Sequence, residues 1–267
     1  MIYNLKKITE SLLDSVVEAG EIAKEISQRG VKITIKHDKS PVTDGDIEVD
    51  QILTSNIKKL TPDIPIISEE TVDLRVENKW KTFWLIDPID GTKDYIKKRD
   101  EYTLNAALIM NFQPVAGVVY APKKDRLFFA YSEKNSTNEI KKYSYETTKK
   151  RNTTKRLNCQ KKNRSEIIGL TNSDNTPDEV LKIYKDHEVS KTIKMSSSLK
   201  FCVIAAGEAD IYAAQARAFE WDIAAGHAIL EHAGGFISTI NEKSFLYGKK
   251  DYKNLAIIVK REKNLQK

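Results

Sequence analysis

Three strand-like segments follow one another in the middle of the chain with no helical pattern between them. Residues 102–110, 115–120 and 126–131 are rich in aliphatic and aromatic side chains, and the short turns between them contain proline together with Asn or Asp. Consecutive strands joined by short turns form antiparallel sheets, whereas parallel strands need a long crossover. We therefore expect an antiparallel sheet at the centre of the first part of the chain.

Helical patterns flank this sheet on its N-terminal side, and alternating elements follow it. Apolar side chains recur at helical spacing over residues 5–26, before Gly30, and again from residue 43 or 44 to residue 60, before Pro62. Beyond residue 160, strands and helices alternate. We expect strands at 166–171, 192–195, 210–213, 236–240 and 255–259, and helices at 177–186, 198–206 and 221–233. The expected division is an α+β half, 1–140, and an α/β half, 141–267.

Composition and charge limit the classes of partner. The chain is 40% hydrophobic and 31% charged, as in ordinary globular proteins, and no apolar run is long enough to span a bilayer. No secretory signal is apparent, and Cys159 and Cys202 lie far apart, as free thiols of a reducing compartment would. We expect no transmembrane segment and a cytoplasmic location, with peripheral association at the inner face of the cell membrane left open.

The net charge of +6 favours a small anionic ligand. Much of the excess lies in residues 134–164, which are polar, poor in aliphatic side chains and without regularly spaced aromatics on which bases could stack. We expect this basic stretch to be a solvated loop and sheet edge, and we expect no nucleic-acid partner.

The stretch 84–92 (WLIDPIDGT) combines an apolar run, two carboxylates and a glycine-threonine step. Asp87 and Asp90 follow the apolar residues of an expected strand at 83–86, and Pro88 rigidifies the turn between them. Two neighbouring buried carboxylates repel each other unless a cation neutralises them. Oxygen ligands suit Mg²⁺, and the start of a helix at Gly91 or Thr92 suits a phosphate. The stretch therefore predicts a Mg²⁺-dependent phosphatase.

Other acidic pairs occur at the ends of expected elements, and each could equally be a cap or a solvated carboxylate. They are Asp44 with Asp46, Glu69 with Glu70, and Asp222 after a tryptophan. The chain has no G-x-S-x-G, no G-x-x-x-x-G-K-[ST] and no H-E-x-x-H motif. His227 and His232 are five residues apart and do not share a helix face, so we expect them to be structural, and we expect Cys202 in the core.

Three motifs in this order resemble the inositol monophosphatase superfamily of Mg²⁺-dependent, lithium-sensitive phosphatases. They are DPIDGT at 87–92, SEE at 68–70 and WDIAAG at 221–226. Within that superfamily, the stretches 40–46, 91–96 and 197–202 are most similar to the CysQ-type 3′(2′),5′-bisphosphate nucleotidases. The resemblance covers residues 5–260. It implies a layered αβαβα sandwich and a monomer or homodimer.

The resemblance also implies roles for individual residues. The metal ligands would be Glu69, Asp87, the main-chain carbonyl of Ile89, Asp90 and Asp222. Asp46 and Thr92 would orient and deprotonate the attacking water, and Glu70 would support a further ion. The N–H groups of Gly91 and Thr92 would hold the scissile phosphate, and Ser197, Ser198, Lys200 and Arg217 would bind the rest of the substrate.

The implied reaction is hydrolysis of the 3′-phosphate of 3′-phosphoadenosine 5′-phosphate to AMP and phosphate. Lys200, where inositol monophosphatases usually have a neutral residue, would meet the second phosphate, although an exposed helix lysine is the alternative. One position departs from the pattern, because Ala214 stands where these nucleotidases usually have an arginine. Arg217 could supply that charge. Inositol or sugar phosphatase activity is the alternative, and a non-catalytic phosphate-binding protein is a second.

Overall fold

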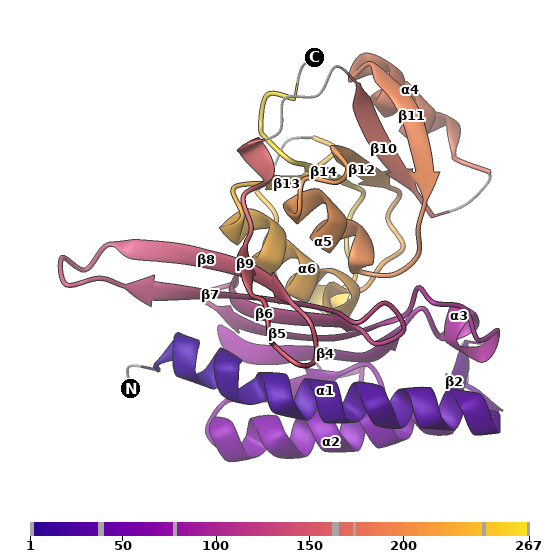
Figure 1. Ribbon diagram of the computed structural model, residues 1–267, viewed down its shortest axis with the longest axis vertical. Coiled ribbons are helices and arrows are strands. Elements are labelled where there is room, and N and C mark those ends of the chain that lie inside the picture. Colours follow the sequence, from indigo (N-terminus) through magenta and orange to yellow (C-terminus); the bar gives the residue numbers. More distant parts are fainter. Residues whose placement is uncertain are drawn as a thin grey trace.

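The computed structural model describes residues 3–36, 40–76, 79–161, 166–172, 175–241 and 244–265. Five layers stack in the order helix, sheet, helix, sheet, helix (Figure 1). The expected αβαβα sandwich is confirmed. No helix in these ranges is both long enough and apolar enough to cross a bilayer.

The first sheet has seven strands arranged in chain order. β3 runs parallel to β4, and every later neighbour is antiparallel, as the three consecutive strand patterns predict. The strands are β3 (Ile66–Ser68), β4 (Thr82–Asp90), β5 (Thr103–Met110), β6 (Gln113–Ala121), β7 (Arg126–Lys134), β8 (Ile140–Thr147) and β9 (Lys155–Arg156).

Helices α1 (Leu5–Arg29) and α2 (Asp44–Leu60) cover one face of this sheet, and α5 (Leu199–Ala205) and α6 (Glu220–His232) cover the other (Figure 1). α1 buries a stripe that includes Leu12, Val16, Ala19 and Ala23, and it ends where Gly30 adopts a positive φ of 96°. A short ribbon of β1 (Ile33–Ile35) and β2 (Pro41–Thr43) joins the two helices.

The second sheet has the strand order β11-β10-β12-β14-β13. α4 (Asp178–Asp186) packs on its outer face through Val180 and Tyr184, while α5 and α6 fill the space between the two sheets. The strands are β10 (Ile167–Thr171), β11 (Val189–Lys194), β12 (Ile211–Ala214), β13 (Phe236–Thr239) and β14 (Ile257–Lys260), and 3₁₀ turns occupy Cys159–Lys161 and Lys250–Tyr252.

The basic stretch 134–164 is loop and sheet edge, as expected, and it contains the strands β8 and β9. Tyr145 stacks on Phe129 with ring centroids 5.2 Å apart, and Tyr143 stacks on Tyr131 at 5.3 Å, so aromatic pairs hold β8 to β7. The first sheet thus continues to Arg156, past residue 140. The assignment of 1–140 and 141–267 as two functional halves stays a prediction, and residues 162–164 lie outside the described ranges.

The histidines and cysteines have the structural settings that the spacing predicts. His227 Nδ1 lies 2.9 Å from the Tyr247 hydroxyl, and His232 Nε2 lies 2.8 Å from Ser132 Oγ, so neither is paired with the other. Burial lowers the pKa of His227 to about 3 and that of His232 to about 4, which keeps both neutral. Cys159 and Cys202 are buried free thiols.

Candidate active site

The two aspartates of β4 are brought to one site by an irregularity in the strand. Asp87 pairs with Asn105 of β5 and Asp90 pairs with Thr103, so three steps on β4 match two steps on β5. Residues three apart in a regular strand point to opposite faces, and one extra residue restores the same face. Pro88 lies within this bulge. Proline has no N–H group to donate to a neighbouring strand, and a bulge is one of the few places in a sheet that tolerate it.

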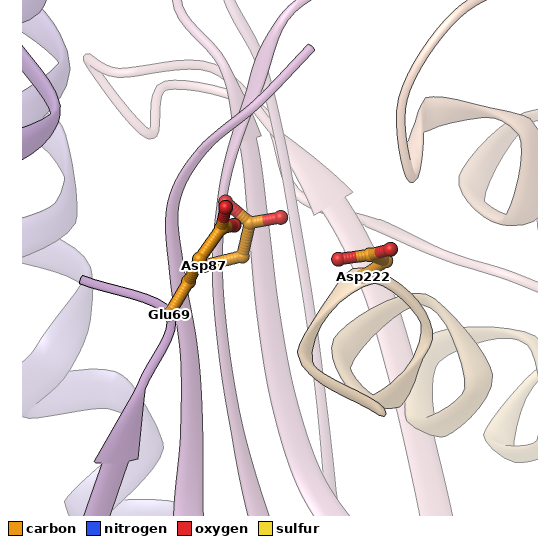
Figure 2. Close-up of side chains that lie close together, drawn as sticks. All are labelled: Glu69, Asp87 and Asp222. Carbon is orange, nitrogen blue, oxygen red and sulfur yellow. The ribbon is translucent and has the colours of Figure 1, made fainter. Parts of the chain in front are cut away.

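Three carboxylates meet at this end of the sheet. Glu69 follows β3, Asp87 lies on β4, and Asp222 lies in the first turn of α6 (Figure 2). One oxygen from each lies within 4.8 Å of the others. Elements far apart in sequence, two from the first sheet and one from the helix layer between the sheets, therefore converge on one acidic centre.

Burial and mutual repulsion disfavour the charged forms of these groups. Burial raises the pKa of Glu69 to about 7, and the neighbouring Glu70 adds to the rise against the pull of Lys36. The pKa values of Asp87 and Asp222 lie well above the ordinary range, because burial is reinforced by the other carboxylates. Asp87 Oδ1 is buried and has no hydrogen-bond partner. An orphaned carboxylate oxygen within an all-oxygen cluster fits a hard divalent cation.

Glu69 is expected to make the metal-free protein less stable as pH rises from about 4.5 through 7. The pKa of Glu69 is about 7 in the folded protein against 4.5 ordinarily, so between these values the folded state binds more protons than the unfolded state, and the contribution of Glu69 to stability falls with pH. His227 and His232 act in the opposite sense up to about pH 6.5, because their pKa values are lowered in the folded protein. The Glu69 contribution is therefore read from the difference in melting temperature between Glu69→Gln and wild type in a chelator, which should shift in favour of Glu69→Gln as pH rises. A difference that stays constant with pH would contradict this account.

Asp90 links the acidic centre to the second half of the chain. Its carboxylate accepts the backbone N–H of Ser198, while Ser198 Oγ donates to the carbonyl of Asp222. Burial raises the pKa of Asp90, although the ammonium of Lys200 and the Ser198 N–H oppose that rise. Asp90 also raises the pKa of Asp222 by repulsion, but it is not one of the three carboxylates whose oxygens lie within 4.8 Å of one another.

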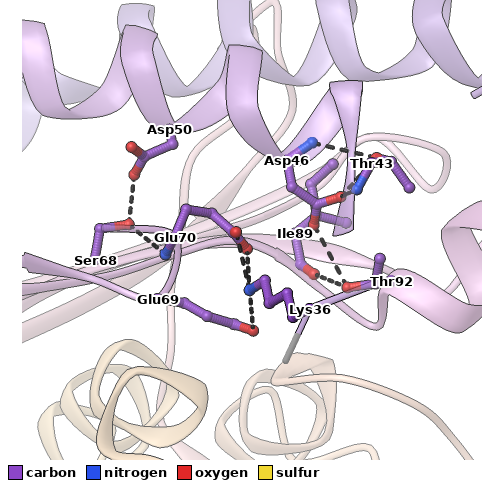
Figure 3. A network of polar contacts seen from close by, with 9 residues as sticks. All are labelled: Lys36, Thr43, Asp46, Asp50, Ser68, Glu69, Glu70, Ile89 and Thr92. Atoms are coloured by element: carbon purple, nitrogen blue, oxygen red, sulfur yellow. Dashed lines mark hydrogen bonds and ion pairs between the residues drawn. The ribbon is translucent and has the colours of Figure 1, made fainter. Parts of the chain in front are cut away.

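Thr92 and Asp46 come together as the resemblance implies (Figure 3). Thr92 Oγ1 lies 3.4 Å from Asp46 Oδ1 and 3.2 Å from the carbonyl oxygen of Ile89. Thr92 begins the short helix α3 (Thr92–Ile96), and Gly91 before it adopts a φ of 93° that favours glycine. Asp46 is buried and also accepts from Thr43 N and Oγ1, at 2.8 and 2.6 Å. Burial raises its pKa.

Lys36 is the site residue that the sequence did not reveal. Its ammonium lies 2.9 Å from the Glu70 carboxylate and 3.4 Å from that of Glu69 (Figure 3). Burial lowers the pKa of Lys36, but the two carboxylates outweigh it and leave the pKa raised. The Glu70 carboxylate thus already forms an ion pair with a side chain of the protein. No local pattern marks this lysine, because 33 residues separate it from Glu69.

A cavity of about 520 Å³ opens beside the acidic centre. Lys200 lines it and is only 6% exposed, so the alternative of an exposed helix lysine is wrong. Its ammonium donates to the Ser197 carbonyl at 2.6 Å and lies 5.1 Å from the ring centroid of Tyr212. Burial lowers its pKa to about 8. Arg217 and Ala214 line the same cavity.

The model of the inositol monophosphatase family matches residues 4–267. The 3′(2′),5′-bisphosphate nucleotidase CysQ of Buchnera aphidicola is 36% identical, over 88% of this chain and 87% of its own, and that of Salmonella typhimurium is 35% identical, over 79% and 81%. The crystal structure of CysQ from Bacteroides thetaiotaomicron superposes with a TM-score of 0.75 at 29% identity, over 97% of this chain and 98% of its own.

Proposed function

Because the chain belongs to the inositol monophosphatase family, we propose that it is a Mg²⁺-dependent phosphatase that converts 3′-phosphoadenosine 5′-phosphate to AMP and phosphate. The observation that carries this proposal is the buried Lys200 in the cavity beside the acidic centre, since a substrate with one phosphate at the centre could place a second near its ammonium. Relatives at 35–36% identity bear the name of that activity.

Mg²⁺ would be held by Glu69, Asp87, Asp90 and Asp222 with the carbonyl of Ile89, and Glu70 would support a further ion in competition with Lys36. The bound cation would polarise the phosphoryl oxygens and lower the pKa of the attacking water. This donor set is all oxygen, as Mg²⁺ prefers. Lithium sensitivity is part of the proposal.

Thr92 and Asp46 would orient the attacking water and take up its proton. A hydroxyl has one proton to donate, so Thr92 Oγ1 can accept from a water only while it donates its own proton to Asp46 or to the Ile89 carbonyl. The raised pKa of Asp46 makes this carboxylate a better base than an exposed one. The N–H groups of Gly91 and Thr92 would hold the scissile phosphate.

Substrate selection would come from Ser197, Ser198, Lys200 and Arg217. Arg217 lies at the rim of the cavity and lowers the pKa of Lys200, so the two cations face a common space. Two cations there favour a second phosphate over a neutral hydroxyl.

Arg217→Gln should raise the KM for 3′-phosphoadenosine 5′-phosphate by roughly tenfold, because a charged hydrogen bond contributes about 1.5–3 kcal/mol. Steady-state kinetics would measure this KM together with the KM for 3′-AMP, which lacks the 5′-phosphate. An unchanged KM for both substrates would show that Arg217 does not replace the arginine missing at Ala214.

The proposal is tested with purified protein and Mg²⁺ on 3′-phosphoadenosine 5′-phosphate, inositol 1-phosphate and fructose 1,6-bisphosphate, each with and without lithium. We expect the nucleotide to have the highest kcat/KM. If it is the poorest substrate, the subfamily assignment fails and an inositol or sugar phosphatase takes its place. A cytoplasmic location and a monomer or homodimer complete the proposal.

A further inference from the structure

The loop before Lys200 is tied to the first half of the chain by three carboxylates. Residues 195–198 connect β11 to α5. Ser196 N donates to Glu101 Oε2 at 2.9 Å, Ser196 Oγ donates to the carboxylate of Asp94, and Ser198 N donates to that of Asp90. These partners lie in or beside α3 and β4, so the contacts cross from one half of the chain to the other.

This segment needs such support because it is locally unfavourable. Ser197 has a φ of 57°, in the left-handed region that side chains other than glycine and asparagine rarely adopt. Its carbonyl receives the Lys200 ammonium at 2.6 Å, so the position of this peptide sets the position of the charge. A small shift of the segment would move the ammonium relative to the acidic centre.

Of the three carboxylates that hold residues 195–198, that of Glu101 lies outside the wall of the cavity. Asp90, Asp94 and Ser196 line the cavity, whereas Glu101 contacts its wall through Ser196, raises the pKa of Lys200 by its charge, and is itself paired with Lys124 at 3.7 Å. Ser198 keeps separate bonds to Asn105 and to the Asp222 carbonyl, so the acidic centre does not depend on Glu101.

We propose that Glu101 is a positioning residue, which through Ser196 fixes residues 195–198, the loop before Lys200, and so sets the preference for a substrate with a second phosphate. This inference rests on the proposed function, in which Lys200 meets that phosphate. Loss of Glu101 would then weaken recognition of the second phosphate and spare the chemistry at the first.

The test compares 3′-phosphoadenosine 5′-phosphate with 3′-AMP, which differ only in the 5′-phosphate. In Glu101→Ala we expect the KM for the bisphosphate to rise about tenfold, with its kcat and both constants for 3′-AMP within threefold of wild type. Glu101→Gln keeps an oxygen that can accept the Ser196 N–H and should restore most of the KM. Ser196→Ala, which removes the bond to Asp94, should shift the KM in the same direction.

Glu208→Ala is the matched control, because Glu208 also joins the two halves, through Arg126 at 2.6 Å, but does not line the cavity. It should leave the ratio of the two substrates unchanged. Equal losses on both substrates in Glu101→Ala, or no change in either, would overturn the positioning role. A wild-type enzyme with no preference for the bisphosphate would overturn the proposed function itself, before any variant is measured.

Discussion

Asp90→Asn is expected to abolish turnover, with a loss in kcat of more than about 100-fold. Loss of a group that only supports a metal ligand costs about 10- to 100-fold in metal affinity or activity, and Asp90 is proposed as a ligand itself. The fold should survive, because the amide oxygen can still accept the Ser198 N–H. Phosphate release and circular dichroism would be measured together, with Mn²⁺ binding as an independent readout of the site.

Asp14→Asn provides the matched control for this change. Asp14 lies on the exposed side of α1, where its side chain is 74% exposed, pairs with Arg151 and does not line the cavity. Its substitution should change neither turnover nor Mn²⁺ binding. An active Asp90→Asn enzyme would refute the assignment of the metal ligands.

Lys200→Ala is expected to lower kcat/KM for 3′-phosphoadenosine 5′-phosphate by roughly 10- to 100-fold, because a charge-assisted hydrogen bond to phosphate is lost. For 3′-AMP the change should stay below about threefold. The comparison isolates the 5′-phosphate, since both nucleotides present the same scissile group to the acidic centre.

Because Lys200 is buried, its truncation to alanine also leaves a cavity beside Tyr212. Lys200→Met fills most of that space without the charge and should show the same selective loss. If both variants lose activity equally on the two nucleotides, Lys200 is a packing residue and not a phosphate ligand.

Much of the fold could be predicted because its helices and strands have strong local patterns. The stripe of α1 and the consecutive strands β5 to β7 are examples. β8 was missed because its first three residues are exposed and its buried residues, Ser144 and Thr147, are polar, so only the tyrosines that pack against β7 mark it as a strand. The helix α5 is buried on all sides, so helical periodicity could not show which way Lys200 points.

The acidic centre was predictable from the order of its motifs, but its geometry was not. Spacing alone places Asp87 and Asp90 on opposite faces of a strand, and it is the bulge at Pro88 that brings them together. Lys36 and Glu101 act across long sequence separations, through contacts that only the packed structure creates. Sequence patterns report local preferences, and these two residues have none that distinguishes them.

The most direct test of the central claim is the identity of the products formed from 3′-phosphoadenosine 5′-phosphate with Mg²⁺ and with a chelator. We predict AMP and one equivalent of phosphate with Mg²⁺, and no release with the chelator. Release that persists in the chelator would contradict the role of the carboxylates Glu69, Asp87 and Asp222. Adenosine 3′-phosphate as the product, or no product with Mg²⁺, would contradict the proposed reaction.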